Sequence, residues 1–151
     1  MTGRILIFEA GGERITLPLE QVAEVQEFTS SFPLPLAPPF LGRAISANGC
    51  LIPVLDMGMF LGREPSAPSG RILVMAGDGV NLALQVDRVT DIVQDDTVTA
   101  QKPAAAGEPF AGVLEFACGE MPLLSPGQLL RLLERVLAGS GRDKCHENPA
   151  G

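Results

Sequence analysis

Short apolar runs separated by turn residues extend along most of the chain, and they predict a protein built mainly from strands. Arg4–Glu9 and Arg14–Leu17 have the composition and alternation of two strands joined by a glycine-containing turn. After Pro18, Leu19–Ala23 is typical of one helical turn, and Val25 continues toward a third strand. Many short strands at close spacing are typical of small β-barrels or sandwiches.

The middle of the chain contains the clearest hairpin. Arg43–Ala47 and Leu51–Leu55 read as strands joined by Asn48-Gly49, a pair that tolerates the positive φ angles of a two-residue turn. Pro53 cannot donate a ladder hydrogen bond, so we expect it at a sheet edge or a bulge.

Two helices have identifiable starts. Asp56 is placed to cap a short helix that runs to Leu61. Ser125 is a suitable N-cap for a longer one, with Pro126 at the first helical position and Gln128 completing a capping box. The apolar stripe of the longer helix consists of Leu129, Leu132, Leu133, Val136 and Leu137.

The sequence repeats itself. Arg4–Ile7 matches Arg71–Val74, and Leu17–Val25 matches Leu84–Ile92, in both cases at an offset of 67 positions. The later hairpins match at offsets of 69 or 70, as a small insertion would give. A constant offset indicates two similar modules in tandem.

Each module is near the lower size limit for an independent core, so we expect one domain in which the two halves pack together. The predicted boundaries are a domain over 1–139 with halves at about 4–62 and 71–124, a linker over 63–70, a final helix over 125–138 and a disordered tail over 140–151.

Charge and composition exclude several functions. The 151-residue chain has a net charge of −7 and contains no Trp and no Tyr. A strongly acidic protein is repelled by nucleic-acid phosphates and anionic lipid, so we expect neither nucleic-acid binding nor direct membrane insertion. The apolar runs are too short to span a bilayer, and the start of the chain lacks the features of a signal peptide, so we expect a cytoplasmic protein.

The three cysteines and the single histidine do not form a recognisable site. Cys50 and Cys118 are expected to be reduced and half-buried, and Cys145 lies beside His146 in the polar tail. We predict no metal and no cofactor, because structural zinc needs four ligands. A thiol enzyme that uses Cys50 or Cys145 remains an alternative from a different class of function.

The residues resemble the CheW-like domain family. The resemblance lies in LPLEQVAEV over 17–25, in Gly42, and in Gly49-x-x-Ile52-Pro53-Val54-x-Asp56. It continues in LALQVDRVTDIV over 82–93 and in the AGVLEF and MPLLS segments that begin at Ala111 and Met121. These segments extend over almost all of the predicted domain.

The resemblance implies a mainly β fold of two SH3-like, five-stranded β-barrel subdomains with short helices and a C-terminal helix. It also implies a non-catalytic adaptor that couples a CheA-type histidine kinase, through its regulatory domain, to the cytoplasmic tips of methyl-accepting chemoreceptors.

Carried over residue by residue, the resemblance also implies a set of partner-binding positions. They are Val22, Glu24, Gly42, Asn48, Gly49, Val86 and Val89. For the valines, the spacing alone favours a place in the core over a place in an interface, and Glu24 without the resemblance is an ordinary solvated charge.

One position departs from the family pattern. Where the family has an arginine before the second glycine of the hairpin, this chain has Asn48. An amide cannot replace the five donors of a guanidinium. The alternative function is therefore a divergent interaction module of this type, which acts outside chemotaxis or assembles with itself.

Overall fold

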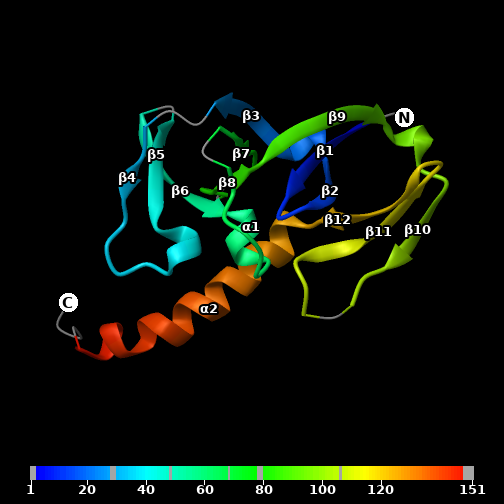
Figure 1. Ribbon diagram of the computed structural model, residues 1–151. Helices are drawn as coiled ribbons and strands as arrows, with labels where there is room; N and C mark the ends of the chain where they lie inside the picture. Colours follow the sequence, from blue (N-terminus) through cyan, green and yellow to red (C-terminus); the bar gives the residue numbers. More distant parts are fainter. Residues whose placement is uncertain are drawn as a thin grey trace. The chain divides into compact units, whose positions relative to one another are not determined.

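The computed structural model describes residues 3–27, 30–47, 49–67, 69–77, 80–105 and 107–147, with side chains as far as residue 137. The chain divides into two compact units, residues 1–97 and residues 98–151. In Figure 1 the first unit runs from blue to green, and the second ends in the red part of helix α2.

The first unit consists of nine strands and short helical turns among its described residues. In chain order they are β1 (Arg4–Ala10), β2 (Glu13–Pro18), η1 (Leu19–Gln21), β3 (Val22–Glu27), β4 (Phe32–Pro33), η2 (Pro39–Leu41), β5 (Arg43–Ala47), β6 (Cys50–Asp56), α1 (Met57–Phe60), β7 (Arg71–Met75), β8 (Ala83–Val86), β9 (Arg88–Gln94) and η3 (Asp95–Thr97).

These strands form a six-stranded sheet and a separate set of three strands. The six-stranded sheet has the order β3-β7-β8-β6-β5-β4, and β2, β1 and β9 lie side by side in the other set. Among the described residues of this unit, the strand pairs are antiparallel except β6 with β8, which is parallel. The sixth strand of the sheet, beyond the five predicted for a barrel, is the two-residue β4.

The sequence repeat reappears as a reciprocal exchange of strands. β3 pairs with β7, so that Val25 lies opposite Leu73, and β9 pairs with β1, so that Ile92 lies opposite Leu6. Adding 67 to Val25 gives Ile92, and adding 67 to Leu6 gives Leu73, so the two pairs are equivalent. Each half therefore supplies the strand that pairs with the first strand of the other half.

The core of the six-stranded sheet comes from alternate positions on neighbouring strands. Its buried cluster consists of Ile45, Ala47, Ile52, Val54, Ile72, Val74 and Ala83. Successive side chains of a strand point to opposite faces, so this one-in-two spacing collects the cluster on one face of the sheet.

Pro53 lies where a strand tolerates a missing donor. It sits opposite Ala44 of β5, and the ladder with β8 begins only at the next residue, Val54. At Pro53, β6 therefore has a ladder partner on only one side. This is a position where a residue without an N–H group is tolerated.

The segment predicted as a linker is tied to the sheet by two carboxylates. Asp56 accepts hydrogen bonds from the backbone and hydroxyl of Ser66, and Asp87 accepts one from the Ala67 N–H at 2.8 Å. Ser66 is buried. Gly58 lets the segment approach the backbone of α1 closely, because a Cβ atom at Gly58 would lie 2.1 Å from the Glu64 carbonyl oxygen.

The second unit is an antiparallel set of three strands followed by a helix. Its elements are β10 (Ala100–Pro103), β11 (Phe110–Phe116), β12 (Gly119–Leu124) and α2 (Pro126–Glu147), with β11 between β10 and β12.

Helix α2 begins as predicted but differs in its details. The Ser125 hydroxyl accepts the Gln128 N–H at 3.3 Å, which is the expected cap. The Gln128 side chain does not close a capping box, because its amide donates to the carbonyl oxygens of Glu108 and Phe110. The helix continues to Glu147 instead of ending at residue 138, so Gly139 does not terminate it. Residues 148–151 of the predicted tail lie outside the described residues.

In the described part of the chain, no helix combines the length and hydropathy needed to cross a bilayer.

Candidate functional site

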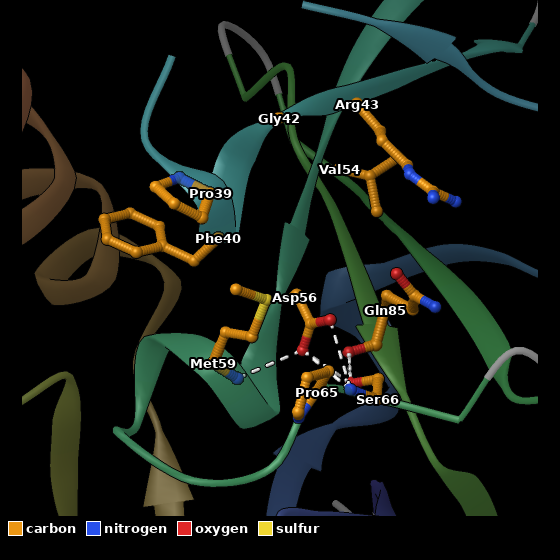
Figure 2. A pocket seen from close by; sticks show the side chains of 10 residues that line it. All are labelled: Pro39, Phe40, Gly42, Arg43, Val54, Asp56, Met59, Pro65, Ser66 and Gln85. Atoms are coloured by element: carbon orange, nitrogen blue, oxygen red, sulfur yellow. Dashed lines mark hydrogen bonds between the residues drawn. The ribbon is translucent and has the colours of Figure 1, made fainter.

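A pocket of about 330 Å³ opens in the first unit at one end of the sheet core (Figure 2). We call it the Gln85 pocket. Its lining comes from η2, β5, β6, α1, β8 and the segment between α1 and β7. The lining residues are Pro39, Phe40, Gly42, Arg43, Val54, Asp56, Met59, Pro65, Ser66 and Gln85.

A hydrogen-bond network around Asp56 fixes the floor of the Gln85 pocket. One carboxylate oxygen of Asp56 accepts the Met59 N–H at 3.1 Å, which caps α1, and the Ser66 hydroxyl at 2.9 Å. The Ser66 N–H lies 3.0 and 3.1 Å from the two carboxylate oxygens. The Ser66 hydroxyl also lies 3.0 Å from the Gln85 carbonyl oxygen. Figure 2 shows these bonds converging around Asp56 and Ser66.

The opposite wall of the Gln85 pocket is apolar. Phe40 meets Phe60 edge to face, with ring centroids 5.4 Å apart and an interplanar angle of 76°. This geometry is a favourable one for two aromatic rings. Met59 and Pro39 lie beside Phe40, and Val54 lines the pocket on the side of Arg43 and Gln85 (Figure 2).

Gln85 contributes a polar group to a mostly apolar surface. Gln85 is only 7% exposed as a residue, and it shares a sheet face with Ala83 of the core cluster. Figure 2 shows its amide at the pocket wall. The Gln85 main chain accepts the Ser66 hydroxyl and pairs with Ile72 in the ladder of β7 and β8.

A second pocket of about 530 Å³, the Val89 pocket, lies between strand ends of the first unit. Val25 and Val89 supply its apolar surface, and Glu9 and Arg88 supply charge. The Arg88 guanidinium lies 3.4 Å from a carboxylate oxygen of Glu9. Val25 is 45% exposed, so this surface is available to a partner.

The predicted partner-binding residues are distributed over these features. Gly42 lines the Gln85 pocket, and Val89 lines the pocket named after it. Val22 is half-buried at the start of β3, and Glu24 is exposed, with its carboxylate accepting a hydrogen bond from Gln26.

The other three residues differ in their surroundings. Gly49 is exposed with φ 79°, as the hairpin turn requires, and Asn48 lies outside the described residues. Val86 is fully buried in the structure, so its side chain contributes to the core, and its role in partner binding stays a prediction. It closes the core because it sits in the central strand β8.

Both described cysteines are exposed, contrary to the expected half-buried state. Cys50 begins β6 next to the hairpin turn, and Cys118 lies in the equivalent turn before β12. A turn residue such as Cys118 and the first residue of a strand such as Cys50 lie at the surface, which fits their exposure. The side chains of Cys145 and His146 lie outside the described residues. In the part of the chain that the structure describes, no three Cys, His, Asp or Glu residues gather as metal ligands.

An exposed charge cluster lies on the strands of the second unit. The Lys102 ammonium lies 2.5 Å from Glu120 and 2.9 Å from Glu115. The hydrogen bond to Glu120, supported by Glu115, raises the pKa of Lys102 above its usual value. Exposed pairs of this kind contribute little to stability, so we assign the cluster no functional role.

Sequence reasoning missed the Gln85 pocket as a unit. It singled out Gly42 alone, whereas Phe40, Met59 and Gln85 come from separate segments that only the fold brings together. A polar Gln between the apolar residues Leu84 and Val86 was the available signal.

Comparison with known proteins gives a consistent result. Residues 4–134 match the family model described as a CheW-like domain. The curated relatives include a probable chemotaxis protein CheW from Rhizobium etli, 24% identical over 91 residues, and a chemotaxis protein CheW from Rhizobium meliloti, 29% identical over 94 residues. The aligned parts cover 59% and 60% of this chain, and 59% and 61% of those relatives.

The solved structures include that of the scaffolding protein TtCheW from Thermoanaerobacter tengcongensis. It superposes with a TM-score of 0.71 at 21% identity, over 83% of this chain and 90% of that one. The likeness establishes a shared, mainly β fold of two SH3-like subdomains with a C-terminal helix.

Proposed function

Because the chain belongs to the CheW-like domain family, we propose that it is a non-catalytic adaptor that couples a CheA-type histidine kinase to chemoreceptors in the cytoplasm. The observation that carries the proposal is the family match over residues 4–134, which includes every element from β1 through β12 and the beginning of α2. The family is one of scaffold proteins, which fits a role in binding rather than in catalysis.

The exposed strands β3 and β9 support this function. They are the end strands of their sets, and they are equivalent in the sequence repeat. Val25 and Ile92 are each 45% exposed on them, so both strands present apolar side chains to solvent. A few apolar anchors of this kind, surrounded by polar residues, commonly dominate the affinity of an interface.

Binding to the kinase tests the proposal. The full chain is titrated by calorimetry with the regulatory domain of a CheA-type kinase and, separately, with a chemoreceptor cytoplasmic fragment. We expect a dissociation constant on the order of ten micromolar or tighter for the kinase domain. Absence of heat and of co-elution at protein concentrations of about 100 micromolar would contradict the proposal.

Asn48 favours a second candidate, a divergent module that acts outside chemotaxis or assembles with itself. Replacing Asn48→Arg restores the guanidinium that the family pattern has at this turn. If Asn48→Arg gains binding to the receptor fragment while kinase binding is unchanged, the chain is a coupling protein that has lost one contact. If neither the unchanged chain nor Asn48→Arg binds the receptor fragment, the divergent module is the better description.

A further inference from the structure

We propose that the Val89 pocket is a docking site for a partner segment that has a carboxylate next to an apolar side chain, and that Arg71 binds the carboxylate. This inference rests on the proposed function in one respect, because it takes the occupant to be part of a partner protein. Arg71 is then the residue that selects the segment.

The Val89 pocket has apolar surface beside Arg71. Val25 of β3 and Val89 of β9 line it, and Val25 is 45% exposed. In the ladder of β3 and β7, Val25 lies opposite Leu73, and Arg71 precedes Leu73 by two residues on the same face of the sheet. Val25 and Arg71 are therefore diagonal neighbours, a separation that a long side chain can bridge. One occupant can contact both residues.

The two carboxylates of the Val89 pocket already have partners. Asp87 uses one oxygen to accept the Gly11 N–H at 3.2 Å and the other to accept the Ala67 N–H at 2.8 Å. The Glu9 carboxylate is paired with the Arg88 guanidinium at 3.4 Å. Both acids are held by contacts within the fold, so neither needs a cationic occupant.

Arg71 keeps most of its hydrogen-bond donors unused. A guanidinium has five N–H donors, and the contacts of Arg71 are two long ones from Nη1, to the carbonyl oxygens of Ser69 at 3.3 Å and Gly70 at 3.4 Å. Glu27 lies opposite Arg71 in the ladder, but none of the ion pairs found among the described residues involves either side chain. A planar guanidinium with free donors fits a carboxylate through two parallel hydrogen bonds.

Arg4 shows which part of this arrangement is special to the pocket. It lies 67 positions before Arg71 and is its equivalent in the sequence repeat. Arg4 is exposed at the start of β1, whereas Arg71 is half-buried and lines the Val89 pocket. An ion pair is stronger where water is partly excluded, so Arg71 is the better carboxylate site of the two.

The size and charge of the surroundings favour a segment over a free anion. The pocket has a volume of about 530 Å³, which is within the usual range for sites that bury a ligand much larger than a single carboxylate. The chain has a net charge of −7, which repels free anions at long range. Apolar contact with Val25 and Val89 is what an anion lacks and a peptide segment supplies.

The test uses two blocked dipeptides that differ only in the carboxylate, N-acetyl-leucyl-glutamate methylamide and N-acetyl-leucyl-glutamine methylamide. The full chain is observed by NMR. We expect saturable shifts of the Val25 and Val89 methyls and of the Arg71 Nε–H, with a dissociation constant on the order of millimolar for the glutamate peptide. The glutamine peptide should bind at least about fivefold more weakly. At about 1 M NaCl the difference should largely disappear, because salt screens the ion pair.

Substitutions at Arg71 separate the carboxylate contact from the rest of the pocket. Arg71→Gln should reduce the affinity for the glutamate peptide to that of the glutamine peptide, and Arg71→Lys, which keeps the charge without the planar fork, should be intermediate. Arg4→Gln is the matched control and should leave the affinity unchanged. Melting temperatures show whether each variant is folded. If Arg71→Gln does not fold, the comparison of the two peptides on the unchanged chain still decides.

Several results would overturn the inference. They are equal affinities for the two dipeptides, full affinity for the glutamate peptide in Arg71→Gln, and an absence of shifts at Val25 and Val89. Equal affinity for N-acetyl-glycyl-glutamate methylamide, which lacks the apolar side chain, would show an anion site instead of a segment site. The peptide experiment contains no kinase and no receptor, so a failure of kinase binding would count against the proposed function and leave this inference standing.

Discussion

Single residues in this chain serve two segments at once. Asp56 caps α1 and also anchors Ser66, which comes ten residues later. Asp87 accepts the N–H groups of Gly11 and Ala67, from two separate turns. The sequence predicted Asp56 as a cap, but it did not predict the second set of bonds, because a cap is a local property and Ser66 is brought to it by the fold.

Replacing Asp56→Ala should lower the free energy of unfolding by about 2–4 kcal/mol. The change removes a helix cap worth about 1 kcal/mol and charge-assisted hydrogen bonds to Ser66. Urea denaturation measures the loss, with Glu64→Ala, an exposed side chain in the same segment, as the control. A loss for Asp56→Ala no larger than that of the control would show that the bonds to Ser66 do not stabilise the protein.

Replacing Gly58→Ala should destabilise the protein by about 2 kcal/mol or more, since the new Cβ would collide with the Glu64 carbonyl oxygen. Gly42→Ala is the matched variant, because its Cβ would have only ordinary contacts. Thermal unfolding of both variants compares them. Equal melting temperatures would indicate that the segment over 63–67 moves aside at little cost.

At the scale of elements, neighbouring strands have different tasks. β8 is central and fully buried, whereas β9 directly after it is exposed along most of its length. The sequence has the same kind of valine in both strands, so it predicts the same partner-binding role for Val86 and Val89. Only the order of strands decides that one closes the core and the other reaches a surface.

Val86→Asp and Val89→Asp should therefore behave differently. The first places a charge in the core and should cost about 3 kcal/mol or more, enough to unfold much of the protein. The second should cost under about 1 kcal/mol while it weakens binding to the kinase regulatory domain. Circular dichroism and calorimetry follow the two effects. If Val89→Asp unfolds the chain instead, Val89 belongs to the core.

At the scale of the whole molecule, the repeat does not give two halves that stand apart. β3 of the first half pairs with β7 of the second, and β9 of the second pairs with β1 of the first. The exchange gives each half a strand that it cannot supply itself. The predicted linker joins the two halves in sequence, but it does not mark a boundary between sheets.

A fragment of residues 1–67 should consequently be unfolded by itself. Without β7 and β9, both β3 and β1 lose a partner strand. Mixing it with a fragment of residues 68–151 should restore dispersed NMR signals, because the missing partners return. A well-dispersed spectrum of the 1–67 fragment alone would show that the exchange is not needed for folding.

Local chemistry in the sequence was enough to predict most of the strands, the hairpin and the caps at Asp56 and Ser125, because each depends on residues near one another in the chain. The 67-residue repeat is likewise visible in the sequence, because equivalent positions have similar residues. The tertiary structure decided which apolar residues are buried, why Cys50 is exposed, how far α2 extends and which segments surround Gln85. Those properties depend on strand order and on contacts between residues far apart in sequence, and periodicity along the chain does not encode them.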